Sequence, residues 1–203
     1  MEEDKTNGAV SKKKGKSKKK VLNSVKENRI DFKRILYSYK TNDLEILRQT
    51  TLMIKNIPMK FSQNDMLNII NEQFCGKYDF FYLPIDIKTK YNMGFAFINM
   101  TSPIFILDFY LEFNCCRWID KIKYCNSQKY CEIVYANMQG IEECHKELKN
   151  KSIMKKNDKR IKPIFYENML INSIDVNAII AKYSFDASFR NYYEMKLKQF
   201  EYI

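Results

Sequence analysis

The strongest constraint on the fold is the eight-residue segment Met93–Met100, in which small or aliphatic residues alternate with larger side chains. Successive side chains of a β-strand point to opposite faces of a sheet. Phe95, Phe97 and Asn99 therefore share one face of the predicted strand, and the residues between them share the other. Aromatic surface is costly to leave bare in water, so this face should either contact a ligand or be covered by other parts of the chain.

Helices and further strands flank this segment in the order βαββαβ. Ser62 with Asp65 three residues later predicts a helix start, and Gly76 predicts its end. Ser102 and Pro103 predict the N-cap and first residue of a second helix, which runs to about residue 113. The order is that of the ferredoxin-like fold, an α+β architecture that many functions share. The predicted strands cover 51–57, 80–87, 94–100 and 131–136.

The alternation places side chains from three predicted strands on one open face. The second strand contributes aromatic side chains, the first a methionine and a lysine, and the third the residues named above. The predicted members of the face are Phe80, Tyr82, Met53, Lys55, Phe95, Phe97 and Asn99. Leu52, Ile54 and Phe81 point the other way and are predicted core residues.

The octamer resembles the segment [KR]-G-[FY]-[GA]-F-V-x-[FY] of RNA recognition motifs, whose aromatic residues stack on bases. The resemblance implies single-stranded RNA as the partner, with Phe95 and Phe97 stacking on bases. The other residues of the open face would flank the RNA, and Lys55 would contact phosphate together with Lys88 and Lys90 of the basic turn. Met93 replaces the usual Lys or Arg, which removes one phosphate contact.

Longer segments resemble the C-terminal RNA recognition motif of Mei-two-like proteins, over residues 50–166. They include TTLMIKNIP, YDFFYLPID, GFAFIN and CEIVYANMQG. Proteins of that family bind single-stranded RNA and regulate meiosis and development. The resemblance implies that residues 137–166 form a C-terminal extension with an added helix at about Gly140–Lys151. Met53 replaces an aromatic residue of the generic motif, as it does in this family.

The chain divides into five predicted segments, and its net charge of +11 lies mainly in the flanks. Because the centre of the chain is nearly neutral, a ligand bound there is not held by charge alone. The segments are a basic disordered tail (1–23), an N-terminal helical segment (24–48), the RNA recognition motif (50–137), its C-terminal extension (138–168) and a helical tail (169–203).

Two clusters of basic residues in the flanks point to an anionic partner. The first cluster consists of Lys12, Lys13, Lys14, Lys16, Lys18, Lys19 and Lys20. It indicates a nuclear-import signal, a phosphate-contacting arm or a tail that only aids solubility. The second cluster consists of Lys155, Lys156, Lys159, Arg160 and Lys162. It indicates either a phosphate clamp or a solvated surface.

Other functional classes find little support in the sequence. One His and the lack of GxSxG, HExxH and GxxxxGK[ST] segments argue against an enzyme, and no cofactor is expected. The six Cys show no CxxC spacing, so we expect free thiols and no metal site. No apolar run long enough for a membrane span or a signal peptide occurs, which predicts an intracellular protein. The lysine run favours the nucleus, with the cytoplasm as the alternative. The alternative is a protein-interaction module in which residues 24–40 or the C-terminal tail occlude the sheet and the terminal helices dock a protein partner.

Overall fold

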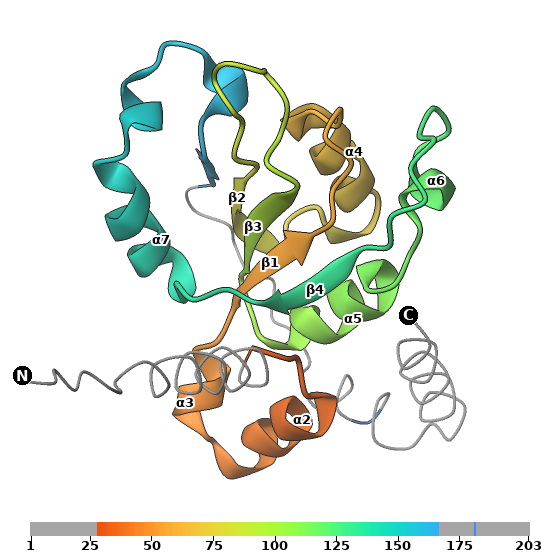
Figure 1. Ribbon diagram of the computed structural model, residues 1–203. Helices are drawn as coiled ribbons and strands as arrows, with labels where there is room; N and C mark the ends of the chain where they lie inside the picture. The colour runs from red at the N-terminus through yellow and green to blue at the C-terminus, as the bar shows by residue number, and fades with distance from the viewer. Residues whose placement is uncertain (1–27, 167–180, 182–203) are drawn as a thin grey trace, which may run out of the picture.

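The computed structural model describes residues 28–166 and residue 181 (Figure 1). Its centre is an antiparallel sheet of five strands in the order β4–β1–β3–β2–β5. The predicted α+β fold with βαββαβ order is confirmed, whereas β5, paired with the free edge of β2, was not predicted. The strands are β1 (Thr51–Lys55), β2 (Tyr78–Tyr82), β3 (Phe95–Met100), β4 (Glu132–Tyr135) and β5 (Ile164–Phe165).

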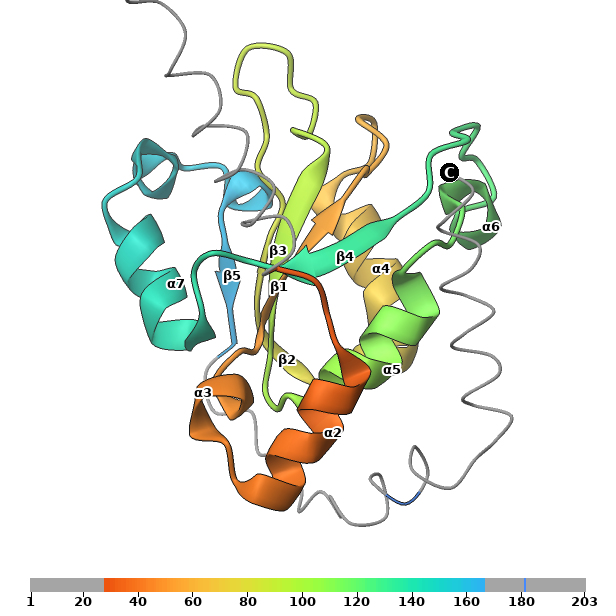
Figure 2. The ribbon, with the colours of Figure 1, turned by 60° about the horizontal axis from the view of Figure 1, so that its bottom comes forward.

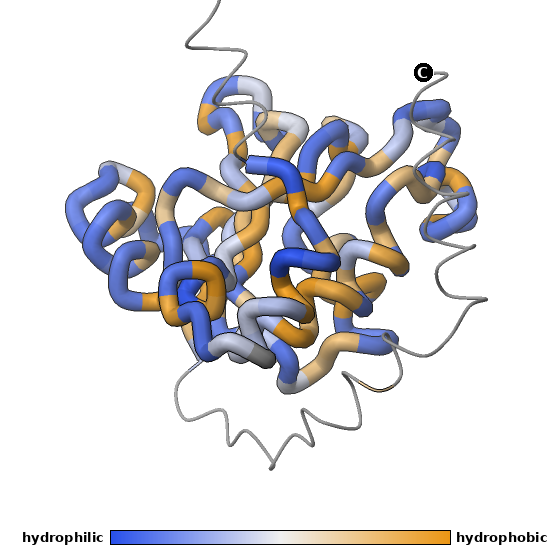
Figure 3. The backbone as a smooth tube through the Cα atoms, turned by 90° about the horizontal axis from the view of Figure 1, so that it is seen from below, coloured by the Kyte–Doolittle hydropathy of each residue, from blue (hydrophilic) through white to orange (hydrophobic). Residues whose placement is uncertain are grey.

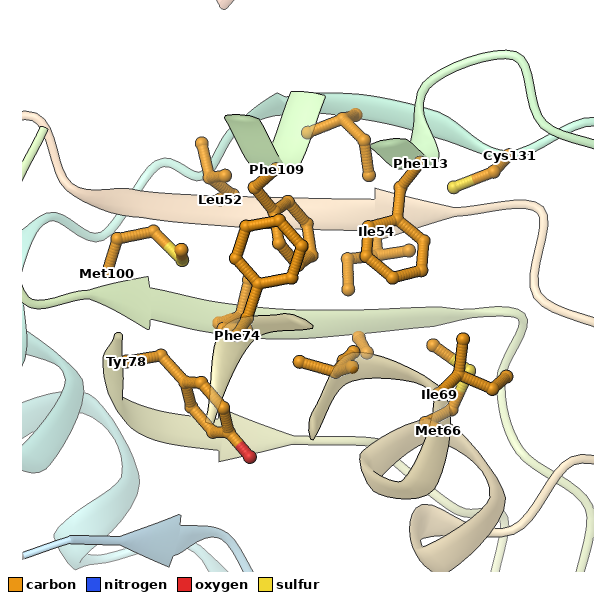
Figure 4. Close-up of a cluster of buried hydrophobic side chains, with 14 of the residues drawn as sticks. Leu52, Ile54, Met66, Ile69, Phe74, Tyr78, Met100, Phe109, Phe113 and Cys131 are labelled. Atoms are coloured by element: carbon orange, nitrogen blue, oxygen red, sulfur yellow. The ribbon is translucent and has the colours of Figure 1, made fainter. Parts of the chain in front are cut away.

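One face of the sheet is covered by α4 (Gln63–Phe74) and α5 (Ile104–Phe113), and the main core lies between these layers (Figure 4). Leu52 of β1 is fully buried there, as predicted. The rings of Phe74 and Phe109 pack edge to face, with centroids 5.1 Å apart, and join the two helices. This aromatic contact fixes the helices to each other and leaves the opposite face of the sheet for other uses.

The sequence signals for helix ends are largely correct. In α4 the Asp65 backbone N–H donates to the Ser62 hydroxyl (3.2 Å) and the Ser62 N–H donates to the Asp65 carboxylate (2.8 Å), which is the predicted capping box. Gly76 follows the helix with φ +77°. The second helix begins one residue later than predicted, because Pro103 is its N-cap in place of Ser102.

The N-terminal segment forms α2 (Phe32–Thr41) and the short α3 (Leu44–Leu47). The α2 helix starts where the Asp31 carboxylate accepts a hydrogen bond from the Arg34 backbone N–H (3.2 Å). Phe32 is buried against Tyr110 of α5, with ring centroids 5.4 Å apart. Residues 28–48, the part of this segment that the structure describes, therefore pack beside α5 at the end of the helical layer (Figure 2) and do not cover the aromatic face of the sheet.

The C-terminal extension contributes α7 (Gly140–Lys149), which confirms the predicted added helix and lies on the sheet face opposite α4 and α5 (Figures 1 and 2). Hydrophilic stretches of the chain lie largely at the periphery (Figure 3). Only Cys144 and Leu148 of α7 are buried. Two 3₁₀ turns, η1 (Ser152–Lys155) and η2 (Lys159–Ile161), lead from α7 to β5.

The long connection between α5 and β4 contains α6 (Trp118–Lys121). Trp118 is completely buried and its ring meets that of Phe61 at 87°, with centroids 5.7 Å apart. Trp118 therefore closes this connection against the core, as predicted. The predictions for residues 1–27 and for the helical tail at 169–203 lie outside the described residues, apart from residue 181.

A buried set of hydrogen bonds links β1, β2 and β3 below α7. The Asn99 side-chain oxygen accepts hydrogen bonds from the hydroxyls of Thr50 (2.8 Å) and Thr51 (2.7 Å). The Asn99 amide donates to the Asp79 carboxylate (2.7 Å). Burial raises the pKa of the Asp79 carboxyl above its ordinary value, and the hydrogen bond from Asn99 partly opposes that shift. Asn99 therefore satisfies three polar groups at once.

The same threonine anchors the start of α7. The Thr51 hydroxyl accepts a hydrogen bond from the Gly140 backbone N–H (2.9 Å). The Gln139 side chain accepts one from the Thr51 N–H (2.9 Å) and donates to the carbonyls of Thr51 (3.1 Å) and Ala136 (2.7 Å). These bonds fix the point at which the chain leaves β4 and turns back across the sheet.

Replacing Asn99 by Ala should lower the free energy of unfolding by about 2–4 kcal/mol, because it leaves two hydroxyls and a carboxylate without their partner. Urea denaturation followed by circular dichroism measures this loss. The matched control is Asn68→Ala on the exposed side of α4, where we expect a change within about 0.5 kcal/mol. Equal stabilities of the two variants would show that the Asn99 hydrogen bonds do not hold the sheet and α7 together.

Candidate nucleic-acid interface

A groove of about 690 Å³ lies on the sheet face, between α7 and the outer strand β4. Its floor comes from β1, β3 and β4, and α7 forms one wall. Asn28 and Arg29, which precede α2, also line the groove. The floor residues are Met53, Lys55, Phe95, Phe97, Glu132 and Val134.

The predicted aromatic pair occupies this floor. Phe95 and Phe97 are half-buried and meet edge to face, with ring centroids 5.5 Å apart and planes at 74°. In the β1–β3 register Met53 stands opposite Phe97 and Lys55 opposite Phe95. The predicted face therefore exists over β1 and β3, with two aromatic rings and a thioether reachable from solvent.

The β2 side of the same face is closed, which corrects the prediction for Phe80. That ring points to the predicted face but is fully buried among Cys144 and Leu148 of α7 and Phe165 of β5, its centroid 4.9 Å from that of Phe165. The His145 ring stacks on that of Phe165, with ring centroids 3.7 Å apart. Alternation along β2 identified the correct face for Phe80. The burial of that face depends on α7, which lies more than sixty residues later in the sequence.

Tyr82 and Asn99 also differ from the open positions predicted for them. Tyr82 is half-buried at the border of the covered cluster, where burial raises the pKa of its hydroxyl. Asn99 is only 3% exposed and its side chain is engaged within the sheet. The prediction that Asn99 faces RNA is therefore wrong, because its amide serves the hydrogen bonds below α7.

Charge in the groove is mixed. The Lys55 ammonium lies 3.1 Å from a Glu132 carboxylate oxygen, with the two side chains 36% and 45% exposed. An ion pair this exposed is weak, so a phosphate can compete for the lysine. Three carboxylates line the groove against the two cations of Lys55 and Arg29, the others being those of Glu143 and Glu147. A nucleic acid held here must gain most of its affinity from base contacts.

A second groove, of about 770 Å³, gathers part of the predicted basic set. It lies between the β2–β3 loop, the start of α4 and the η1–η2 segment, and Lys90, Lys156 and Arg160 line it. The predicted clamp residues Lys155, Lys159 and Lys162 are not among its lining residues. Lys88 lies exposed in the same loop as Lys90.

Arg160 is already engaged by a neighbour. Its guanidinium donates two hydrogen bonds to Asp158, at 2.8 and 3.0 Å, and these hold the pKa of that carboxyl at about 2. The pair is exposed, so it contributes little to stability. Lys90 and Lys156 are therefore the freer cations of this groove.

Comparison with known families decides what kind of domain carries the sheet groove. Residues 49–149 match the family model described as RNA recognition motif 2. These residues are an RNA recognition motif of the Mei2-like type. The resemblance noted in the sequence is thereby confirmed.

Curated relatives share this motif at high identity. Protein MEI2-like 2 of Oryza sativa subsp. japonica is 46% identical over 131 residues, which cover 62% of this chain and 15% of that protein. Protein MEI2-like 3 of Arabidopsis thaliana is 46% identical over 119 residues, or 59% of this chain and 15% of that protein. The chain thus spans about 15% of the length of these relatives.

Solved structures of RNA recognition motifs are more distant. The chain is 15% identical to the Rna15 motif with bound GU RNA, with a TM-score of 0.37, over 50% of this chain and 97% of that one. It is 17% identical to domains 1 and 2 of Sex-lethal from Drosophila melanogaster, with a TM-score of 0.35, over 59% of this chain and 87% of that one.

Several groove residues of this RNA recognition motif escaped the sequence prediction. Val134 carried a usable signal, because alternation along β4 places it on the groove side while Ile133 is in the core. Met138 and the two glutamates of α7 carried none, since their position depends on how α7 packs. Arg29 precedes the matched region altogether.

The remaining sequence predictions concern absences or the tails. Within residues 28–166 no group of three His, Cys, Asp or Glu side chains could hold a metal ion, and the cysteines are free thiols. None of the helices in the described ranges is long and apolar enough to cross a membrane. The lysine run at 12–20 lies outside the part of the chain that the structure describes.

The covered and open aromatic residues should respond differently to truncation. Phe80→Ala should lower the free energy of unfolding by about 3–5 kcal/mol, because it leaves a cavity below α7. Phe95→Ala should cost roughly 1 kcal/mol, since its half-exposed ring loses mainly one aromatic contact. Chemical denaturation of both variants tests this difference. Similar losses would contradict the division of the sheet into covered and open parts.

Proposed function

We propose that the chain binds single-stranded RNA in the sheet groove and acts by binding, not by catalysis. The observation that carries the proposal is the half-exposed Phe95–Phe97 pair, at the place where RNA recognition motifs stack bases. The C-terminal extension buries the neighbouring Phe80, and Phe97 packs against the same cluster, but both rings of the pair remain partly exposed. A fold that covers one aromatic ring and leaves two beside a groove is suited to a ligand with flat faces.

The groove geometry suggests a role for each floor residue. Phe95 and Phe97 each stack on one base, in keeping with the two or three bases that such sheets hold. Met53, opposite Phe97 in the register, and the partly exposed edge of Tyr82 flank the bases. Lys55 leaves Glu132 to contact a phosphate.

Phosphate contacts outside the sheet supply the charge that the groove lacks. Lys88 and Lys90 of the β2–β3 loop and Lys156 beside them are exposed and have the required sign. Lys155, Lys159 and Lys162 add to the field at the same end of the molecule, and Arg160 joins when a phosphate displaces Asp158. Such contacts position the strand, and base contacts specify it.

The double variant Phe95→Ala/Phe97→Ala tests the proposal. Because each stacked base contributes about 1–3 kcal/mol, the affinity of this variant for RNA should fall on the order of 10²-fold or more. The probe is a labelled RNA selected by the wild-type chain from a random single-stranded pool. Fluorescence anisotropy gives the affinity, and circular dichroism with thermal melting verifies that the domain remains folded.

The matched control is Tyr37→Ala/Tyr124→Ala, which removes two aromatic rings that are 65% and 69% exposed and lie outside the groove. We expect this control to bind RNA like the wild type. Unchanged affinity of the folded Phe95/Phe97 variant would sink the RNA-binding proposal.

A protein ligand is a second candidate, favoured by the three carboxylates along the groove. These would suit a basic peptide segment with an aromatic or aliphatic anchor. The affinities of the isolated chain for the two ligands decide between the candidates. If RNA is the ligand, the selected RNA binds at submicromolar concentration. If that RNA binds only at millimolar concentration while a basic protein segment binds through Phe95, the protein candidate is correct.

At the level of the cell we propose a post-transcriptional regulator that acts in meiosis or development. The support is the similarity to MEI2-like proteins at about 45% identity. It concerns one domain, because the chain spans a small part of those relatives.

The lysine run at 12–20 is proposed as a nuclear-import signal, since it places seven lysines in nine residues. Changing all seven to Ser or Gln should abolish nuclear accumulation of a fluorescent fusion, while the sequence preference of RNA binding persists. The control is Glu2→Gln/Glu3→Gln, which neutralises two of the three acids in residues 1–20, and it should remain nuclear. Normal nuclear accumulation without the lysines would refute the import role.

A further inference from the structure

A smaller hollow continues the sheet groove beyond the edge of the sheet. It measures about 360 Å³ and is lined by residues of α2 and α3 together with the end of β4. Arg29 and Tyr135 line both hollows, so the two meet at the edge strand β4. Arg34 and Gln49 line the second hollow and not the first.

The junction between the hollows is fixed by hydrogen bonds. The Tyr135 backbone N–H donates to the Asn28 carbonyl (2.8 Å), and the Asn28 side chain donates to that of Asn137 (3.1 Å). The chain entering α2 is thus held against the end of β4 (Figure 2). The next residue, Arg29, therefore extends from an anchored stretch of backbone, and its exposed side chain lines both hollows.

The charges beyond the edge strand are suited to phosphate. Arg29 and Arg34 are exposed, and among residues 28–166 no carboxylate forms an ion pair with either. The Asp31 carboxylate lines the same hollow, but it accepts the backbone N–H that caps α2. The sheet groove itself carries more carboxylates than cations, so a strand bound there needs cations at an exit.

We propose that RNA bound on the sheet continues over the edge strand β4 onto the N-terminal segment, where Arg29 and Arg34 hold its phosphates. This proposal rests on RNA binding in the sheet groove and adds the direction in which the strand leaves it. Residues 28–48 lie outside the matched family region, so this exit belongs to the flank of this chain. Guanidinium groups suit the task because they bind phosphate oxygens in a bidentate manner.

The other occupants of the second hollow are less suitable. Residues 1–20 carry eight lysines against three acids, so this arm has the wrong charge for a site with two arginines. An acidic peptide has the right charge, but it would not extend the path from the aromatic pair. RNA satisfies both hollows with one ligand.

The test compares Arg29→Ala/Arg34→Ala with Lys33→Ala/Arg48→Ala. Both doubles remove two exposed cations from the same segment, but Lys33 and Arg48 line neither hollow. The probes are two labelled single-stranded RNAs selected by the wild-type chain, one of four nucleotides and one of twelve. Affinities are measured between 0.05 and 0.3 M salt, and thermal melting checks the fold.

For the twelve-nucleotide RNA, Arg29→Ala/Arg34→Ala should lower the slope of log K against log salt by about 1.4, or roughly 25-fold in affinity at 0.1 M salt. The four-nucleotide RNA, confined to the sheet, should be affected much less. Arg29→Lys/Arg34→Lys should retain most of the slope. The Lys33/Arg48 double should leave both RNAs unchanged.

Equal losses in the two doubles would show a diffuse field in place of a path and would overturn the proposal. No loss in the Arg29/Arg34 double would overturn it as well and leave the second hollow to an acidic peptide. Either failure leaves the sheet proposal standing if Phe95→Ala/Phe97→Ala still weakens both RNAs. If that variant binds normally, RNA binding on the sheet fails first.

Discussion

The hydrogen bonds between Thr51 and the Gln139–Gly140 turn determine which part of the sheet a ligand can reach. They fix the direction in which the chain leaves β4, so that α7 crosses the face over β2 and not over β1. Asn99 supports the same threonine from β3. If this turn were released, Phe80 would lose its cover and the groove would lose its wall. One small polar cluster therefore separates a structural half of the sheet from a binding half.

This division explains why aromatic residues on the same face have different roles. The Phe80 ring packs among side chains from α7 and β5 and stabilises the extension. The Phe95 and Phe97 rings contact each other, line the groove and are exposed enough to accept a flat ligand. The carboxylates along the rim disfavour non-specific attraction of phosphates to the sheet. Affinity for RNA would then come from stacking on the sheet and from cations placed around its margins.

Much of the fold could be predicted because its signals are local. Alternation along the strands fixed the faces of β1 and β3, and Ser62 with Asp65 fixed the start of α4. The accessible site was harder to predict, because accessibility is a tertiary property. Alternation cannot show that α7 covers Phe80, or that the amide of Asn99 is used within the sheet. β5 has only two residues, too few for a periodic pattern. The role proposed for Arg29 could not be predicted either, because it depends on the position of this residue at the edge of β4.

The central claim is that RNA occupies the open half of the sheet and not the half below α7. Methyl NMR of the ¹³C-labelled methionines during titration with selected single-stranded RNA tests it most directly. Met53 and Met138 line the groove, whereas Met66 and Met100 are buried in the core on the far side of the sheet. We predict saturable shifts for the Met53 and Met138 methyls, with those of Met66 and Met100 nearly unchanged. Saturable RNA binding that leaves the Met53 and Met138 signals in place would contradict the claim.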